Sequence, residues 1–425
     1  MDWVPLIITG IKVFFFTFVV ILPLIAYSTY AERRVCAIMQ DRVGPNRVGI
    51  PLTLLGFKKD LSFFGLLQPL ADGLKGLFKQ DLTPGHVRKS FYWMAPALTA
   101  VPAFITVCVI PFGSNVNLFG HDVKLVIADI GAGPLFVFAI ASLSVYGITL
   151  AGWSSNSKYP FFGGVRSCAQ MISYEIALGL SIIPVLMVFG KLNLTDIVTH
   201  QSEKGWLLLP LWNEHGSIFS GDYWAHCGPQ WLLLLPLGIS FIVFTTSIFA
   251  ETNRMPFDLP ECETELVGGY HTEYSSMKFA LFFMGEYAAM IVGSAVIVTI
   301  FFGGWSLGFG LDSALLQTGE GDWKWFAGFI HLGVFLAKTI GFIIFFIWVR
   351  WTVPRLRYDQ LMKLGWVVFF ELALFNIFIA ALIIAAPHIG PLLTLFVGVP
   401  ILLALAAIMY FITKSVESKH KVNIT

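Results

Sequence analysis

The sequence is poor in charge, because Asp, Glu, Lys and Arg make up only 12% of its 425 residues. That share is about half of what an ordinary soluble domain carries. The 27 basic and 26 acidic side chains nearly cancel, so bulk charge indicates no nucleic-acid partner. None of the five cysteines lies in a Cys-x-x-Cys pair, which excludes a disulfide framework and a zinc or iron–sulfur ligand set of the usual spacing. We therefore expect no flavin, metal or iron–sulfur cluster in this chain.

Long apolar runs are what the sequence has in place of charge, and 56% of the residues are hydrophobic. A membrane span needs about 20 mostly apolar residues, and lipid leaves a helix as the way to pair its backbone. We predict an all-α polytopic membrane protein in which residues 1–425 form a single integral membrane domain. Nine spans are predicted: Val4–Tyr27, Phe91–Ile110, Val126–Ala151, Cys168–Phe189, Trp231–Ala250, Phe279–Phe302, Phe326–Trp348, Gly365–Ala386 and Pro391–Ile412.

The distribution of Lys and Arg predicts the orientation of these spans. The connections on one side of the membrane, together with the C-terminal tail, carry 21 of the 27 Lys and Arg residues. The opposite connections carry 4. Cytoplasmic loops hold the excess of positive charge, so the richer side is assigned to the cytoplasm. We predict an N-terminus outside and a C-terminus inside.

An amphipathic segment covers residues 61–80. Gln68, Asp72, Lys75 and Lys79 recur at helical spacing and share one face, while leucines share another. The pattern predicts a helix that lies in the membrane interface. Periodicity alone favours a surface anchor with a solvated polar face. The sharper alternative is the wall of a cavity that an amphiphilic ligand enters from the lipid.

A basic loop precedes this segment. Arg33, Arg34, Arg42 and Arg47 lie within about 15 residues, around the turn sequence Gly44-Pro45-Asn46. These arginines can serve as positive-inside anchors, or they can form a rigid basic loop for a partner protein or an anionic group. The pattern leaves both readings open.

Ionisable residues within the predicted spans include Asp129, Glu175, Glu286, Lys338 and Glu371. Each charge at a helix centre costs roughly 2.5–3.5 kcal/mol, so such residues usually face a protein interior or an ion pathway. Asp129 lies near the outer end of its span, where a structural role is the simpler reading. Lys338 and Glu371 fit a structural pair between neighbouring helices. For Glu175 and Glu286, which lie deeper in their helices, we favour proton handling.

The connection 251–276 is strongly acidic on the side that should be positive. Residues 251–275 carry one base, Arg254, and a net charge of −5. A solvated loop is the usual reading of such a run. Here the acids alternate with Pro and large apolar residues, which predicts a partly buried loop whose carboxylates titrate together. The acids are Glu251, Asp258, Glu261, Glu263, Glu265 and Glu273.

Several long segments resemble the H subunit of bacterial NADH–quinone oxidoreductase (respiratory complex I), the counterpart of mitochondrial NADH dehydrogenase subunit 1. They run in order from residue 31 to about residue 287. The matching segments are Ala31-Glu32-Arg33-Arg34, Arg42-Val43-Gly44-Pro45-Asn46-Arg47-Val48-Gly49, Gln68-Pro69-Leu70-Ala71-Asp72-Gly73-Leu74-Lys75, Gly152-Trp153-Ser154-Ser155-Asn156-Ser157-Lys158-Tyr159, Gln170-Met171-Ile172-Ser173-Tyr174-Glu175, Ala250–Glu265 with Glu273-Tyr274, and Phe279–Tyr287.

The resemblance implies a membrane subunit that forms part of a quinone chamber, docks a hydrophilic iron–sulfur arm, contacts small membrane subunits laterally and starts a proton relay. It implies a bacterial cytoplasmic membrane, quinone as substrate and membership in an enzyme complex, without a redox centre in this chain. By position, the quinone entrance and channel would be lined by Arg33, Arg34, Arg42, Gln68, Asp72, Lys75 and Phe283. The region near the quinone would hold Arg254, Asp258, Glu261, Glu263, Glu265 and Glu273, and the relay would continue through Glu251, Glu175 and Glu286.

Three features depart from that family: an insertion at 55–65, Cys262 in place of a usual Gly, and a long external connection at 191–229. An alternative reading is the homologous subunit of a membrane-bound hydrogenase or ferredoxin-linked complex. A further one is a stand-alone antiporter or passive scaffold. The near-complete Gln68–Lys75 and Glu261–Leu266 segments favour the quinone enzyme, and the partly buried acidic loop disfavours a scaffold.

Overall fold

The computed structural model describes residues 4–49, 64–118, 121–210, 212–213, 216–217, 222, 230–258, 268–308, 310–312, 316 and 326–389. Several predictions fall outside these residues. They are the ninth span Pro391–Ile412, the loop carboxylates Glu261, Glu263 and Glu265, Cys262, positions 61–63 of the amphipathic segment and most of the insertion at 55–65.

Helices dominate the described chain, which confirms the all-α membrane fold. Eight helical stretches are long and apolar enough to cross a membrane, by length and composition. In chain order the elements are α1 (Val4–Phe14), the π-helical η1 (Phe15–Ile21), α2 (Leu22–Met39), α3 (Gln68–Phe78), α4 (Lys89–Thr106), η3 (Val107–Val109), β1 (Asn115–Leu118), β2 (His121–Lys124), α5 (Gly133–Ala141), α6 (Ser144–Ser154), α7 (Lys158–Phe189), α8 (Leu194–Lys204), β3 (Trp212–Asn213), β4 (Gly216–Ser217), α10 (Gln230–Glu251), η5 (Gly269–His271), α11 (Ser276–Phe301), α12 (Ala327–Thr352), α13 (Tyr358–Lys363), the π-helical η7 (Leu364–Phe369) and α14 (Phe370–Ile389).

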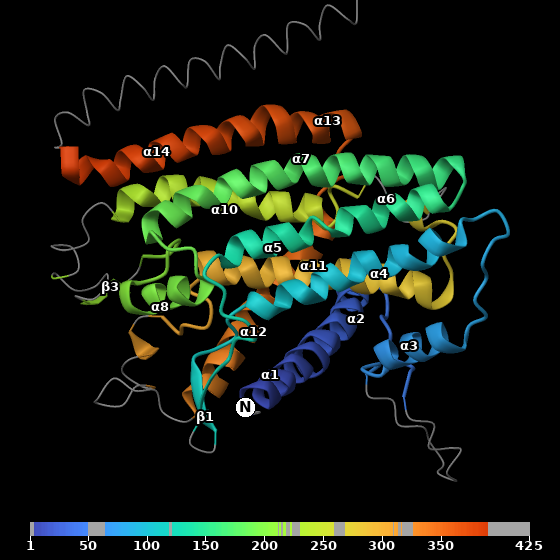
Figure 1. Ribbon diagram of the computed structural model, residues 1–425, viewed down its shortest axis with the longest axis horizontal. Helices are drawn as coiled ribbons and strands as arrows, with labels where there is room; N and C mark the ends of the chain where they lie inside the picture. Colours follow the sequence, from blue (N-terminus) through green and yellow to red (C-terminus); the bar gives the residue numbers. More distant parts are fainter. Residues whose placement is uncertain are drawn as a thin grey trace, which may run out of the picture.

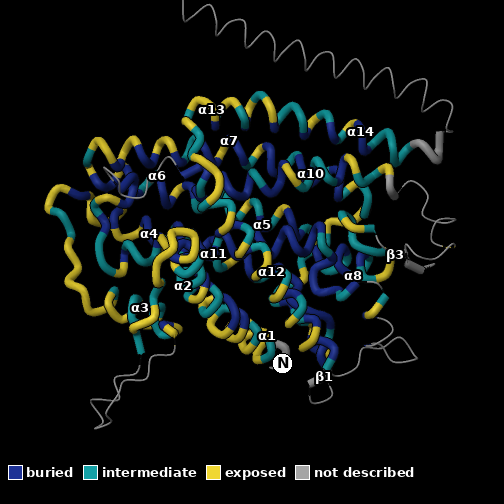
Figure 2. Tube along the Cα trace, turned by 180° about the vertical axis from the view of Figure 1, so that it is seen from behind, coloured by how far each residue is buried: buried dark blue, intermediate teal, exposed yellow. Residues whose placement is uncertain are grey.

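Helix α11 lies in the middle of the bundle. It packs against α4, α10, α12 and α2, while α14 lies along α7 and α10 at one edge (Figure 1). Helices α1 and α2 form one rod that crosses the other helices obliquely in both views (Figure 1, Figure 2). The hairpin β1–β2 and α8 lie at one end of the bundle, and α3 lies at the other. Helix α11 therefore connects the two ends through the core.

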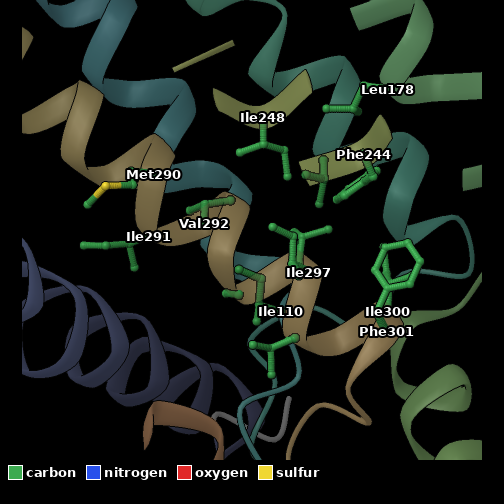
Figure 3. Packing of buried hydrophobic residues seen from close by; sticks show 14 of the residues in the cluster. Ile110, Leu178, Phe244, Ile248, Met290, Ile291, Val292, Ile297, Ile300 and Phe301 are labelled. Carbon is green, nitrogen blue, oxygen red and sulfur yellow. The ribbon is translucent and has the colours of Figure 1, made fainter. Parts of the chain in front are cut away.

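The core explains why α11 takes this central place. The second half of α11 consists largely of Ala, Val, Ile and Ser on every face of the helix, and most of these residues are buried. A helix that is apolar all round is stable only when neighbours or lipid cover every face. Figure 3 shows that its side chains pack against others from α7, α10 and the segment after α4. The labelled residues are Ile110, Leu178, Phe244, Ile248, Met290, Ile291, Val292, Ile297, Ile300 and Phe301.

Close helix contacts depend on glycine at two positions. A Cβ atom on Gly147 of α6 would lie 2.6 Å from the backbone nitrogen of Thr99 in α4. One on Gly163 of α7 would lie 2.8 Å from the backbone nitrogen of Tyr270 in η5. Neither distance leaves room for a larger side chain. Glycine thus lets η5, which follows the acidic loop, sit directly on α7.

The amphipathic segment contains helix α3, and Pro69 lies in its first turn, where a proline needs no backbone donor. None of its residues is buried, and Figure 2 shows α3 at the periphery of the bundle. Its end is held to the start of α11. The Ser276 hydroxyl donates to the carbonyls of Gly76 and Lys79, and Lys278 pairs with Asp81 at 2.8 Å. The helix therefore has a fixed place although it buries no side chain in the core.

Two of the predicted boundaries, the end of the first span and the start of the third, are wrong. The first helix does not end near Tyr27 but continues to Met39, since η1 joins α1 to α2 without a break. The third span begins at Gly133 and not at Val126, so Asp129 lies in the connection before α5. There it accepts hydrogen bonds from Lys124, Asn193 and Thr195, which confirms its structural role. The short hairpins β1–β2 and β3–β4 and the helix α8 were not predicted.

Candidate functional site: a buried ion-pair cluster between two cavities

Four charged side chains meet where α2, α11, α12 and the turn after α10 converge. Arg254 forms an ion pair through Nε with Glu286 at 2.6 Å and donates through Nη1 to Glu32 at 3.0 Å. Arg350 pairs with the second oxygen of Glu32. The Tyr287 hydroxyl donates to Glu32 at 2.6 Å, and its ring lies 4.1 Å below the Arg254 guanidinium. We call Glu32, Arg254, Glu286, Tyr287 and Arg350 the arginine cluster.

The turn that presents Arg254 is anchored from α7. Helix α10 ends at Glu251, and Asn253 takes a left-handed backbone with φ of 49°, which Asn tolerates better than most residues. The Gln170 side-chain amide donates to the carbonyls of Ala250 and Phe257. Ser167 exchanges hydrogen bonds with the Asn253 side chain. Because this turn is tied down on both sides, the direction of Arg254 is fixed.

Burial makes the charge balance of the cluster important. Arg254 is 4% exposed and Glu32 is 6% exposed, so both charges are removed from water. Burial alone would lower the pKa of Arg254, but the charges of Glu286 and Glu32 outweigh it and raise that pKa well above its ordinary value. Two arginines face two glutamates, so their formal charges cancel. Removing one partner would leave a buried charge uncompensated.

A first cavity opens beside the cluster. It has a volume of about 350 Å³. That size is typical of a small-molecule site, and its wall combines aromatic rings with a few converging charges, as such sites usually do. The lining residues are Asn253, Arg254, Met255, Asp258, His271, Phe279, Phe283, Glu286, Arg350 and Trp351. We call this space the polar cavity.

A second, narrower cavity runs through the helix bundle. Its volume of about 80 Å³ is enough for several water molecules, and both Glu251 and Glu286 line it. Glu175 acts electrostatically on Glu251, so these two carboxyl groups lie near each other. We call this space the internal cavity. Glu286 and Asn253 lie on the walls of both cavities and so stand between them.

Four of the seven predicted entrance residues, Arg33, Arg42, Gln68 and Asp72, lie near the end of α2. Arg33 pairs with Asp72 of α3 at 2.6 Å, and the Gln68 side-chain amide donates to the same carboxylate at 2.9 Å. Arg33, Gln68 and Arg42 line an open cavity of about 680 Å³ together with the loop 43–48. Of α3, only its first residue, Gln68, is part of this lining, so the choice between a surface anchor and a cavity wall stays a prediction. Arg34 and Lys75 lie outside the lining of this cavity, and Phe283 lines the polar cavity.

The acidic loop does not form one group in the described residues. Asp258 is buried and lines the polar cavity beside Arg254. Glu273 lies elsewhere, where its carboxylate is 3.9 Å from His86 and its carbonyl accepts from Tyr92 of α4. The structure thus brings Arg254, Asp258 and Glu286 together and separates Glu273 from them.

Sequence reasoning assigned no role to Glu32, Tyr287, Arg350 or His271. Glu32 precedes two arginines and looks like part of a solvated charged run, and Arg350 at a span end looks like a positive-inside anchor. The available signal was helical phase. Since α2 continues past Arg34, Glu32 and Arg33 must point in different directions, and only Glu32 is buried.

The predicted pair of Lys338 and Glu371 is wrong. The Lys338 ammonium donates to three backbone carbonyls beyond the end of α11. Glu371 lies in α14, whose described helical neighbours include α7 and α10, and its Oε2 atom is buried without a hydrogen-bond partner in the described structure. The two residues therefore belong to separate places in the bundle.

The fold and site define a polytopic helical membrane protein whose buried ion pairs separate two cavities. A family model described as NADH dehydrogenase matches residues 11–381. An H subunit of NADH-quinone oxidoreductase from Geobacter metallireducens is 44% identical over 367 residues, covering 86% of this chain and 94% of that protein. The H subunit of the Rickettsia bellii enzyme is 45% identical over 387 residues, covering 91% and 96%. The H subunit of the Leptospira biflexa enzyme is 43% identical over 391 residues, covering 90% and 96%.

The chain belongs to the NADH dehydrogenase family that comprises these H subunits. It is accordingly a multi-pass membrane subunit of NADH–quinone oxidoreductase, the electron-transport enzyme known as respiratory complex I. Both the resemblance and the fold class inferred from the sequence are confirmed.

Proposed function

We propose that this chain forms the membrane side of a quinone chamber and starts a proton or charge relay into the membrane arm of a proton-pumping complex. The observation that carries the proposal is the position of Glu286. It lines the polar cavity with Arg254, Asp258 and Phe283, and it lines the internal cavity with Glu251. One carboxylate thus faces both the space for the substrate and the space for water.

The polar cavity suits a quinone chemically. Phe279 and Phe283 offer aromatic faces to a flat ring, and Arg254 and Arg350 offer donors to the carbonyl oxygens. The open cavity lined by Arg33, Arg42 and Gln68 lies at the start of α3, and this helix carries the exposed side chains of Leu70 and Leu74. An amphiphilic substrate in the membrane interface would meet this apolar face first.

The relay follows from charge. A quinone that takes up two electrons also takes up two protons to become a quinol, and ionisable groups beside it lose or regain protons as it does so. A change of charge in the polar cavity alters the electrostatic energy of the ion pair between Glu286 and Arg254. Water in the internal cavity would carry a proton between Glu286 and Glu251, and Glu175 would continue the path.

The relay is tested by replacing Glu286 and Glu175 with Gln in the intact complex, reconstituted into vesicles. Gln keeps the shape of the side chain and removes its proton-carrying charge. We expect both variants to lose most proton pumping per assembled complex, with NADH–quinone turnover impaired when it is coupled to pumping. Glu175→Gln lies outside the arginine cluster and should assemble normally, whereas Glu286→Gln also removes a charge partner of Arg254 and should reduce the amount of complex. Glu203→Gln, the same change on an exposed face of α8, should pump normally. Full pumping by both test variants would refute the relay.

The chamber is tested with a photoreactive quinone analogue. We expect inhibitor-sensitive crosslinks in this chain near Phe283 or along Gln68–Lys79. Crosslinks confined to other subunits would refute the chamber and leave the relay standing, which separates the two halves of the proposal.

We further propose the arrangement that the resemblance implies. The iron–sulfur arm docks on the cytoplasmic face, small membrane subunits pack laterally, and the chain lies in a bacterial cytoplasmic membrane with its N-terminus outside. The matched relatives are named as NADH–quinone oxidoreductase subunits, which favours that enzyme over a membrane-bound hydrogenase. Cysteine labelling from each side at two exposed positions, Lys191 after α7 and Lys363 at the end of α13, would test the orientation, since only the former should react from outside.

A further inference from the structure

The end of α11 opposite the arginine cluster holds a cation in a cage of backbone oxygens. The cation is the Lys338 ammonium of α12. Its Nζ atom donates to the carbonyls of Phe302, Gly304 and Ser306 at 2.9, 3.0 and 2.6 Å. The ring of Trp206 lies 4.0 Å from the same nitrogen. Three carbonyl oxygens and one aromatic face thus converge on a single positive charge.

The chain is built to form this cage. A helix leaves its last carbonyls without partners, and the C-terminal end of its dipole favours a cation. Gly303 and Gly304 then take left-handed backbone angles, with φ of 69° and 51°. A Cβ atom on Gly303 would lie 2.3 Å from Trp206, so glycine is required there on two grounds. The pair turns the chain sharply, and the carbonyls of every second residue, Phe302, Gly304 and Ser306, face Lys338.

The number of acceptors identifies the charged form of the side chain. An ammonium group has three N–H donors and no acceptor, and three carbonyls satisfy it completely. A neutral amine would leave one carbonyl facing a lone pair. The interatomic distances also suit an ammonium or potassium ion better than the smaller sodium ion. The three acceptors therefore match the ammonium form of Lys338.

An anion lies close to this cation. Asp312 acts electrostatically on Lys338 and accepts hydrogen bonds from the Ser306 hydroxyl at 2.5 Å and from the Leu307 amide at 3.0 Å. The ring of His331, which is fully buried, bridges Asp312 and Ser114. Burial raises the pKa of Asp312, but the hydrogen bonds from His331 and Ser306 outweigh it and hold that pKa below its ordinary value. The cage thus faces a buried carboxylate that is ionised.

We propose that the end of α11 is a monovalent-cation site whose resident ligand is the Lys338 ammonium, and that it takes a free ammonium or potassium ion once the lysine side chain is removed. Unwound backbone and the C-terminal ends of broken helices are how membrane proteins hold such ions elsewhere. The fixed charge compensates Asp312 and locks the connection after α11 onto α12. This inference does not depend on the quinone chamber or the relay.

The test compares two variants of the intact complex that lose the same charge. Lys338→Ala leaves the cage open, whereas Lys338→Met fills it with an apolar chain of similar length. Purified complexes are heated in tetramethylammonium chloride, in which potassium, ammonium or methylammonium chloride is substituted at constant ionic strength. The half-life of NADH–quinone activity and the melting temperature are recorded.

Both variants should be less stable than wild type in tetramethylammonium, an ion too large for the cage. Potassium and ammonium should restore Lys338→Ala saturably, raising its melting temperature with concentration as a bound ligand does. They should leave Lys338→Met unchanged, and sodium should act less than potassium. Lys338→Arg should not restore stability, because a planar guanidinium cannot present three donors to one point.

Identical behaviour of the Ala and Met variants in all salts would overturn the proposal, as would wild-type stability of both. If Lys338→Ala does not accumulate, the cells are grown with methylammonium. Recovery of assembled complex then supports the site, and no recovery overturns it.

Discussion

The two ends of α11 hold charge in different ways. Near its start, Glu286 is held by a side chain, Arg254, whose other contact is Glu32. Beyond its last turn, Lys338 of α12 is held by backbone carbonyls, which have no second protonation state. The first arrangement lies beside two cavities with carboxylates in their walls, and the second lies beside a cavity of about 370 Å³ whose wall is aromatic apart from Lys338 and Gly341. Charges in a membrane therefore differ in kind: side-chain partners and space for water allow change, whereas backbone partners fix the charge in place.

The largest effect is expected from breaking the balance at the first end. Glu32→Gln would leave Arg254 and Arg350 facing one carboxylate, which leaves one buried positive charge uncompensated. Breaking a buried pair in this way costs about 3–5 kcal/mol. We expect little assembled complex in the membrane, measured by native gel and NADH–quinone activity, while Glu203→Gln assembles normally. Wild-type amounts of the Glu32→Gln complex would show that the cluster is not balanced as described.

An exchange of cation types comes next. Arg254→Lys keeps the positive charge but replaces the planar guanidinium with a compact ammonium group. The ammonium group can no longer contact Glu32 and Glu286 together while packing on the Tyr287 ring. Loss of one charged hydrogen bond costs about 1.5–3 kcal/mol. The melting temperature should fall. Wild-type melting temperatures for both Arg254→Lys and Lys338→Arg would mean that neither end of α11 distinguishes Arg from Lys by geometry.

The smallest effect concerns pH at the second end. Because folding lowers the pKa of Asp312, its stabilising contribution is complete above the ordinary Asp value of about 3.9 and is lost as the pH falls below it. Asp312→Asn should therefore lower the melting temperature by the same amount at every pH from roughly 6 to 8. A difference that changes steeply within that range would indicate that His331 or Lys338 titrates there.

Hydropathy predicted most of the fold, because long apolar runs have few alternatives in lipid. It misplaced the start of the third span because Val126–Ile130 is apolar, yet this stretch runs outside the helix, where Asp129 collects hydrogen bonds from Lys124, Asn193 and Thr195. It also missed that the first helix continues to Met39, since the charged residues after Tyr30 look like the end of a span. Polarity marks where a helix leaves lipid, which is not where the helix ends.

Only part of the site was predictable as residues, and its pairs were not predictable. Glu286 and Arg254 were both singled out, yet their 2.6 Å contact joins residues that sequence spacing cannot relate. Lys338 was read as the partner of an acid because oppositely charged residues in neighbouring spans commonly pair. Its true partners are carbonyls, which every residue possesses and no sequence pattern reveals.

The rod formed by α1, η1 and α2 makes the arginine cluster sensitive to the bilayer itself. It comprises 36 residues, about 54 Å of helix, against a hydrocarbon core of about 30 Å, and it crosses the bundle obliquely. Glu32 lies near its far end. A thinner or thicker membrane changes the tilt angle that such a helix prefers. A small change of tilt displaces the end of the helix more than its middle. We therefore expect lipid chain length to shift the position of Glu32, while its ion pairs with Arg254 and Arg350 oppose that shift.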